Sequence, residues 1–582
     1  MILLRLVGLL LDVVFLPLRL LRRAVAVKPG SFVALTIDGP VADVIPKRRF
    51  WERGREDKST SLHALGELVD AVLGDARVRG IVVTIKRLDA GMASAASLRA
   101  QLARAKKGGK EVVVVLPMGG ATKEVLVASA ASRVIVGPAA TLAPVGFVTT
   151  SRYVKRALDR AGVKAEVFAQ GEYKSAGETL VRDDMSAPQR EQLERLLDGF
   201  HAALISAIAE GRGVSSERAA ELVDGAPYHG ASAVEAGLAD DVAHEDEVAG
   251  LLGLDDAGSV RVGRRGPRVS MSKAVDAGAY LAMKRRPLLR SLVRPPLVYV
   301  IPVHGAIAHA DGPFSRLATD ERLARMVRLA RATPRIKGVI LHIDSPGGSA
   351  LASDRMHHEI VQLAREKPVV ACMANVAASG GYYVAAPAHR IVCAPTTVTG
   401  SIGVIAARFS AEPLLERLGV TTETVQRGAR AGLLSMGRTT TPDERAAMER
   451  ELEATYKTFV RVVASGRKMT EDQVDALARG RVYRGDDARE KGLVDSVGGF
   501  DGALADLRAM LPAHVAARTK VEVARPPRRP VPMLAPPSEG ESGRRAWAAL
   551  AQALVPPRER ALLELAASGE RVLMLWASQV DA

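Results

Sequence analysis

Short apolar runs alternate along the chain with longer segments in which apolar residues recur every three or four positions. The runs at 298–308 (VYVIPVHGAIA), 338–343 (GVILHI) and 368–374 (PVVACMA) predict buried strands. The segments at 317–332 and 352–367 predict helices with one buried face. Regular alternation of strands and helices is typical of an α/β fold in which most strands run parallel.

The residues Thr441-Pro442-Asp443-Glu444 predict the beginning of a long helix. A threonine side chain caps free N–H groups, a proline fits the first turn, and acidic side chains favour the positive end of the helix dipole. Two further elements of the same region are a short helix in GGYYVAAPA and a strand in RIVCAP.

The same series of phrases occurs twice in the chain. RVRGIVVTI at 77–85 corresponds to RIKGVILHI at 335–343, and ASRVIVGPAATLAPVGFV at 131–148 corresponds to AHRIVCAPTTVTGSIGVI at 388–405. Equivalent positions lie about 256 residues apart, far beyond the 20 to 50 residues of solenoid repeats. The sequence therefore predicts two homologous domains that arose by internal duplication.

The duplication divides the chain into five predicted segments. Residues 1–28 form a hydrophobic N-terminal membrane anchor or signal-anchor, and residues 29–261 form the first domain. A basic connector at 262–296 leads to the second domain at 297–520, and a Pro-rich linker and tail occupy 521–582.

The most hydrophobic run of the chain covers residues 1–21, with interruptions at Arg5, Asp12, Pro17 and Arg19. Charges within a span are costly, so the run is interpreted as a marginal span, a short signal-anchor or a helix lying in the membrane interface. Positive charge accumulates after it, which by the positive-inside rule favours a cytoplasmic body.

Composition excludes several other classes of protein. The formal charge is +16, but only 4% of residues are aromatic, which leaves little surface for base stacking and argues against a nucleic-acid partner. Two cysteines exclude a disulfide framework, and no motif indicates a metal site or a cofactor. Cys372 and Cys393 fall on neighbouring predicted strands; free buried thiols are favoured, with a bridge as the alternative.

Two small-residue motifs are present only in the second copy. Asp344-Ser345-Pro346-Gly347-Gly348-Ser349 follows a strand, whereas the first copy has KRLDAG at 86–91. Ala378-Ser379-Gly380-Gly381 places one hydroxyl at a strand-to-helix junction, where the first copy has Thr122 followed by Lys-Glu. Glycine N–H groups can approach a ligand closely, so Ser379 is predicted to be a nucleophile beside an oxyanion-binding backbone. The alternatives are a helix N-cap for Ser379 and a glycine-containing helix-entry turn for the loop.

A serine nucleophile needs a base, and a desolvated lysine can serve as one because burial lowers the pKa of its amine. Lys174, in GEYKSAGE, belongs to the first copy, and its counterpart in the second is Ala431. The serine is thus present only in copy two and the lysine only in copy one.

These motifs, together with TGSIGV at 399–404, resemble those of the signal peptide peptidase A family in its long duplicated form. The resemblance implies tandem ClpP/crotonase-like domains, with Ser379 as nucleophile and Lys174 as general base. It also implies an oxyanion hole from Gly347 or Gly348 together with Gly380, and Ser401 holding the lysine amine.

The same resemblance implies a bacterial inner-membrane homotetramer with no cofactor, whose substrates are cleaved signal peptides and other hydrophobic peptide segments. Members of the family face outward, into the periplasm, in contrast to the orientation that the N-terminal charges favour. Two other functions stay open at this point: an acyl-CoA enzyme, because the crotonase-like fold also binds thioesters, and a non-catalytic membrane scaffold.

Overall fold

The computed structural model describes part of the chain, and most of the anchor predicted at 1–28 and of the tail at 521–582 lies outside that part. None of the helices within the described ranges combines the length and the apolar character that crossing a bilayer requires. The described residues are 12–17, 20, 23, 26–46, 59–254, 262–263, 266–267, 274–285, 294–309, 317–433, 435, 437–525 and 573–575.

The chain forms two compact units, and each contains most or all of one of the two repeated domains. The first unit comprises Met1–Val148 and Gly199–Pro296, and the second comprises Thr149–Asp198 and Leu297–Asp581. The segment Thr149–Asp198 therefore belongs to the first copy by sequence and to the second unit by structure. This segment contains Lys174.

The first unit is built on a parallel sheet with the strand order β10-β6-β4-β3-β1-β13, and β2 pairs with the end of β1. Parallel neighbours require crossover connections, which helices provide. The strands are β1 (Ser31–Ala42), β2 (Thr60–Ser61), β3 (Val78–Asp89), β4 (Glu111–Leu116), β6 (Arg133–Val136), β10 (Asp241–Val242) and β13 (Ala274–Asp276). The helices are α3 (Leu62–Leu73), α4 (Met92–Lys107), α5 (Thr122–Ala128), α9 (Ser216–Asp224), α10 (Ala231–Glu235), α11 (Val248–Leu251) and α12 (Ala277–Arg285).

Two small sheets complete the first unit. One joins β5 (Gly120–Ala121), β7 (Thr141–Ala143) and β9 (Tyr228–His229), and the other joins β11 (Val262–Gly263) and β12 (Gly266–Pro267). The boundary between the units falls within the long helix α8 (Ala187–Arg212).

The main sheet of the second unit has the strand order β23-β21-β19-β17-β14-β25, with β20 beside β19 and β24 beside β20. All of its pairs are parallel except β21 with β23. The strands are β14 (Leu297–His304), β17 (Ile336–Ser345), β19 (Val369–Ala378), β20 (Arg390–Cys393), β21 (Val398–Gly400), β23 (Val482–Arg484), β24 (Ser496–Val497) and β25 (Lys520–Val523). The predicted α/β class with mainly parallel strands is confirmed in both units.

The predicted helices of the second unit form where the sequence placed them. The side chain of Thr441 accepts the N–H of Glu444, and the Glu444 carboxylate accepts the N–H of Thr441, so α17 starts with a complete capping box. The helices are α6 (Lys155–Ala161), α7 (Glu178–Val181), α13 (Asp320–Ala332), α14 (Ala350–Ala364), α15 (Gly380–Ala385), α16 (Glu412–Arg417), α17 (Pro442–Arg467), α18 (Glu471–Leu477), α19 (Gly485–Glu490), α20 (Phe500–Ala509) and α21 (Ala513–Ala516), with a 3₁₀ turn at Ser175–Gly177.

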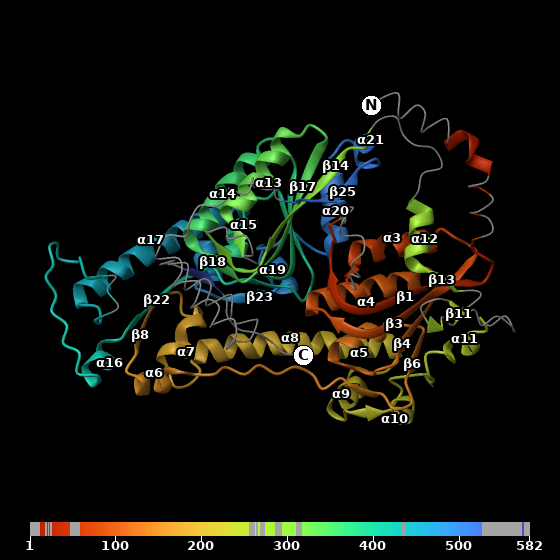
Figure 1. Ribbon diagram of the computed structural model, residues 1–582, viewed down its shortest axis with the longest axis horizontal. Helices are drawn as coiled ribbons and strands as arrows, with labels where there is room; N and C mark the ends of the chain where they lie inside the picture. The colour runs from red at the N-terminus through yellow and green to blue at the C-terminus, as the bar shows by residue number, and fades with distance from the viewer. Residues whose placement is uncertain are drawn as a thin grey trace. The chain divides into compact units, whose positions relative to one another are not determined.

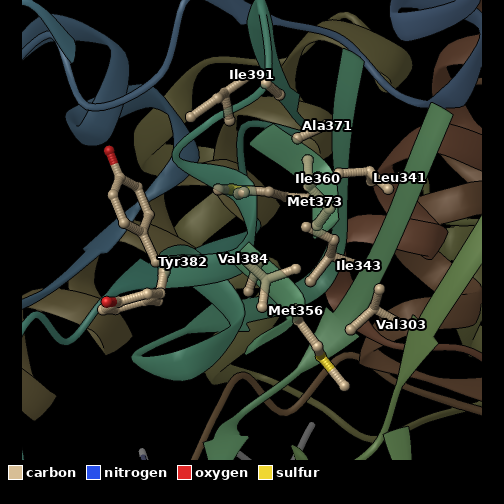
Figure 2. Close-up of a cluster of buried hydrophobic side chains, with 14 of the residues drawn as sticks. Val303, Leu341, Ile343, Met356, Ile360, Ala371, Met373, Tyr382, Val384 and Ile391 are labelled. Atoms are coloured by element: carbon tan, nitrogen blue, oxygen red, sulfur yellow. The ribbon is translucent and has the colours of Figure 1, made fainter. Parts of the chain in front are cut away.

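A buried apolar cluster holds α14 and α15 against the main sheet of the second unit (Figure 2). Met356 and Ile360 from α14 and Val384 from α15 pack with residues of the central strands such as Ile343 and Met373, all fully or almost fully buried. Burial of such side chains contributes roughly 1.5–3 kcal/mol each. The cluster therefore fixes the junction between β19 and α15, where Ser379 lies.

A second sheet lies in the same unit, with the strand order β16-β15-β18-β26-β22-β8. The apolar run at 298–308 supplies two separate strands because Gly305, with φ +81°, turns the chain between β14 and β15. The strands are β8 (Lys164–Gln170), β15 (Ile307–Ala308), β16 (Ala318–Thr319), β18 (Gly347–Ser349), β22 (Val404–Ser410) and β26 (Leu573–Leu575).

Both cysteines are buried and neither forms a disulfide, as favoured from the sequence. β19 and β20 are neighbours, but Cys372 lies opposite Val392 and Cys393 lies opposite Met373. The structure therefore has no disulfide between Cys372 and Cys393.

Candidate active site

The strand β8 brings the first copy's lysine into the second unit. It pairs antiparallel with β22 along seven residues, from Gln170 opposite Val404 to Lys164 opposite Ser410 (Figure 1). Lys174 follows shortly after the end of β8 and immediately precedes the 3₁₀ turn. The two residues that the sequence separates between copies thus lie in one compact unit.

Ser379 occupies the residue between β19 and α15 and is completely buried. Its φ of +54° is unusual for a residue with a Cβ and costs on the order of 1–3 kcal/mol. Its N–H donates to the carbonyl oxygen of Gly400 at 2.8 Å, which holds the turn in place. Ser379 stands at the N-cap position of α15, as the alternative expected, but its side chain makes no capping hydrogen bond, so capping is not the role of its hydroxyl.

The amine of Lys174 lies at the Ser379 hydroxyl. Nζ is 2.8 Å from Oγ of Ser379, and the lysine is only 4% exposed. Nζ also lies 3.0 Å from both the carbonyl oxygen and the hydroxyl of Ser401. Three polar atoms therefore surround one buried amine.

Burial of this amine away from water lowers the pKa of Lys174 well below its ordinary value of 10.5. Within the described residues, no carboxylate forms an ion pair with Lys174 that would oppose this effect. The environment therefore favours the neutral amine, the form with a lone pair.

Ser401 is the second serine at the amine, and it is 1% exposed. Its φ of +50° aims both its carbonyl and its side chain at Nζ, and its N–H donates to the carbonyl oxygen of Arg481 at 2.6 Å. The structure places Ser401 beside the lysine amine, where it was expected.

The glycines of the second copy lie side by side at the serine. A Cβ on Gly380 would lie 2.5 Å from Oγ of Ser353 and 3.3 Å from both Cα of Gly347 and N of Gly348. A Cβ on Gly348, whose φ is +153°, would lie 2.1 Å from the carbonyl oxygen of Ile307. Only glycine fits these positions.

The two glycines of the loop differ in their backbone contacts. The N–H of Gly347 donates to Oγ of Ser345 at 3.2 Å. Gly348 is the middle residue of β18, and its N lies close to Gly380, the first residue of α15. The first N–H groups of a helix have no acceptor within the helix, so Gly380 is suited to bind an oxygen from outside it.

Sequence reasoning missed the loop that supports the lysine. The carbonyl oxygen of Arg479 accepts the N–H of Tyr173 at 2.9 Å, and a Cβ on Gly480 would lie 2.5 Å from the backbone N of Lys174. The Arg481 guanidinium stacks 4.3 Å from the Tyr173 ring centroid. Gly225 is the counterpart of Gly480 in copy one, so a comparison of the two sequences does not single out Gly480. The backbone angle φ differs between the two glycines, being +83° at Gly480 and −81° at Gly225.

Known proteins resemble this chain over most of its length. Residues 104–254 and 361–513 match the family model of Peptidase family S49. The chain is 33% identical over 506 residues to a protein of Arabidopsis thaliana named Serine protease SPPA, chloroplastic, covering 86% of this chain and 72% of the relative. It is 31% identical over 452 residues to Protease 4 of Salmonella typhi, covering 76% of this chain and 71% of that protein.

Solved structures give weaker likenesses. A ClpP1 variant from Listeria monocytogenes matches with 15% identity and a TM-score of 0.24, over 35% of this chain and 94% of that one. A variant of 1510-N, titled a membrane-bound stomatin-specific protease, matches with 16% identity and a TM-score of 0.27, over 40% of this chain and 100% of that one. The two family-model matches and the two long alignments show that the chain belongs to peptidase family S49, as a serine peptidase of the long, duplicated SppA form.

Proposed function

We propose that this peptidase cleaves peptide bonds with Ser379 as the nucleophile and Lys174 as the general base. The observation that carries the proposal is the separation of 2.8 Å between Nζ and Oγ, at two residues that are both buried. A nucleophile and a base within hydrogen-bonding reach, with the base oriented by a third group, are typical of covalent catalysis. Ser401 is the orienting group in this proposal.

The surroundings of the amine support a neutral base. The carbonyl oxygen of Ser401 can only accept, so it takes one N–H of Lys174. The neutral amine keeps a lone pair for the hydroxyl proton of Ser379. Nζ takes that proton as Oγ attacks the substrate carbonyl carbon, and the ammonium then gives it to the leaving amine nitrogen. The product of this step is an ester between Oγ and the substrate acyl group. Water, deprotonated by the same amine, attacks the ester carbonyl carbon, and the ammonium returns the proton to Oγ as the bond to Ser379 breaks.

We assign the oxyanion hole to the N–H groups of Gly348 and Gly380. Gly347 is the less suitable of the two loop glycines because its N–H already donates to Ser345. Donors of this kind stabilise the charge that develops on the carbonyl oxygen, and one of them is worth roughly 2.7–4 kcal/mol of barrier.

For substrates we propose hydrophobic peptide segments, cleaved signal peptides among them, met at a bacterial inner membrane. Membership of the SppA group supports this substrate class, and the apolar run at 1–21 supports attachment. The family resemblance favours a periplasmic body. The charge distribution after residue 21 favours a cytoplasmic one, so sidedness requires protease accessibility measurements on intact and opened spheroplasts.

We further propose a homotetramer, as the family resemblance implies. Leu418, Val420 and Val425 lie close together in the sequence, between α16 and α17, and expose 68%, 48% and 88% of their surface. Exposed large apolar side chains that form a patch are typical of contact sites. Light scattering on the wild type and on Val425→Asp tests this. A tetramer that Val425→Asp weakens is expected, and a monomeric wild type contradicts it.

The experiment that tests the catalytic assignment compares wild type with Ser379→Ala and Lys174→Met on a hydrophobic signal-peptide-like substrate, read by mass spectrometry. Cleavage by the wild type alone is expected. Wild-type turnover by either variant refutes the role of that residue. Membership in a peptidase family sets aside the acyl-CoA and scaffold alternatives.

A further inference from the structure

A strand from the far C-terminal end of the chain lies beside the glycines of the proposed site. β26 (Leu573–Leu575) fits between β18 and β22 and runs antiparallel to both. Leu575 lies opposite Gly347, Met574 opposite Gly348, and Leu573 opposite both Ser349 and Ile405. Without β26, the edges of β18 and β22 would face each other across a gap one strand wide.

The gap between β18 and β22 lies beside the glycines of the proposed active site. Gly347, opposite Leu575, is the residue whose Cα lies 3.3 Å from the Cβ position of Gly380, and β26 also contacts α15. Gly348, opposite Met574, supplies one of the two N–H groups that we assign to the oxyanion hole. A strand in this gap therefore lies where the peptide to be cleaved would lie.

The chemistry of the pairing suits an extended apolar peptide. A peptide that adds a strand to an open sheet edge is held by hydrogen bonds of its main chain, which any sequence can form. Its side chains add selectivity. The segment that occupies the gap is Leu-Met-Leu, of the same chemical class as the proposed substrates.

We propose that the segment Leu573–Leu575 is an internal competitor that binds in the peptide groove between β18 and β22 and restrains substrate entry. This rests on the proposed function, because the groove is the substrate site only if Ser379 is the nucleophile. A segment on the same chain has an effective concentration on the order of mM, so even a weakly binding tail competes measurably.

The test measures binding in a Ser379→Ala background, where no cleavage can occur. A fluorescently labelled peptide with the sequence of residues 571–578 is titrated by anisotropy against the full chain and against a chain ending at Glu570. A second full-length variant, Met574→Pro, loses a backbone N–H in the middle of β26, and Met574→Ala is its matched control. Thermal melting checks that all four proteins are equally folded.

The chain ending at Glu570 and Met574→Pro should bind the peptide about tenfold more tightly than the full chain, and Met574→Ala should bind it like the full chain. Equal affinity in all four proteins, or no binding to the shortened chain, overturns the proposal. With Ser379 intact, ending the chain at Glu570 should lower KM by the same factor and leave kcat unchanged. The binding measurement needs no turnover, so its result is independent of the catalytic assignment. If the tail competes for the peptide but the wild type hydrolyses nothing, the assignment of Ser379 as nucleophile is wrong, whereas the binding of the tail in the groove stands.

Discussion

The two copies of the domain build the same strand-to-helix junction in different ways. In copy one, α5 begins at Thr122, whose hydroxyl donates to the carbonyl oxygen of Gly146 at 3.0 Å. Ala121 before it has an ordinary extended backbone, with φ −91°, and its N–H donates to Glu124. In copy two, Ser379 has φ +54° and its hydroxyl faces an amine.

This difference shows what the proposed catalytic junction has beyond a hydroxyl. In copy one the Thr122 hydroxyl already donates to a backbone carbonyl, and the residues that follow it are Lys123 and Glu124; the glycine pair of that copy, Gly119-Gly120, comes before the hydroxyl. Copy two has a strained serine, close-packed glycines and a buried amine. Strain of this kind persists only where the surrounding packing imposes it, and that is typical of functional sites.

The lysine shows the converse difference. Lys174 of copy one is buried among acceptors, whereas its counterpart Ala431 lies in an exposed turn of copy two. Each copy therefore retains one half of the proposed dyad, and the pairing of β8 with β22 unites the halves in one unit.

The largest expected effect comes from removing the hydroxyl of Ser379, compared with removing the equivalent hydroxyl of Thr122 in copy one. Ser379→Ala should lower kcat by about 10⁴-fold or more because the nucleophile is lost. Thr122→Ala, the matched change in copy one, should leave kcat within twofold. Steady-state hydrolysis of a fluorogenic hydrophobic peptide measures both, and a comparable loss in the two variants contradicts a site confined to copy two.

Removing the base should have the next largest effect. Lys174→Met should lower kcat by about 10²–10⁴-fold, the usual contribution of a general base. Lys123→Met, in copy one, removes an amine that donates to the carbonyl oxygen of Ala90 and should have no effect on turnover. If Lys174→Met keeps wild-type activity in a preparation free of other proteases, the dyad is wrong.

Ser401 is expected to act through the lysine as a positioning residue. Ser401→Ala removes one of the polar atoms around Nζ, and kcat should fall about tenfold to a hundredfold with KM unchanged. Ser401→Thr, which keeps the hydroxyl, should recover part of the rate, although its added methyl group meets a buried site. An effect on KM alone would indicate a role in substrate binding instead.

Two glycines at equivalent positions give the smallest contrast in the series. Gly480→Ala places a Cβ against the Lys174 backbone at φ +83° and should destabilise the fold by about 1–3 kcal/mol while lowering kcat. Gly225→Ala, at φ −81°, avoids the backbone strain, although its Cβ would lie 2.5 Å from the Tyr228 hydroxyl, so it should destabilise the fold less than Gly480→Ala and leave kcat unchanged. Urea denaturation and peptide hydrolysis measure the two effects, and equal losses would mean that the loop does not support the lysine.

Much of this architecture is predictable from sequence because it follows from local patterns. The buried strands, the helices α13, α14 and α17, and the duplication all follow from periodicity, caps and repeated phrases. The motif differences between copies single out Ser379 and the glycines, because an unusual cluster of small residues signals close backbone approach.

Other features depend on long-range packing that no local pattern encodes. The transfer of Thr149–Asp198 into the second unit follows from the register of β8 on β22. The close approach of Gly480 to Lys174 depends on backbone angles. Our proposal of Gly348 rather than Gly347 as oxyanion donor depends on one hydrogen bond, from the N–H of Gly347 to Ser345.

The most direct test of a dyad shared between the copies is the pH dependence of Ser379 acylation. A fluorophosphonate probe should react with Ser379, and intact-protein mass spectrometry measures the rate of this reaction from pH 5 to 10. Lysine accepts a proton only when neutral, so the wild-type rate should rise with pH through a midpoint well below 10.5, because burial lowers the pKa of Lys174. In Lys174→Met this rise should disappear and the rate should stay low. A rise of the same size and midpoint in both proteins would contradict the account.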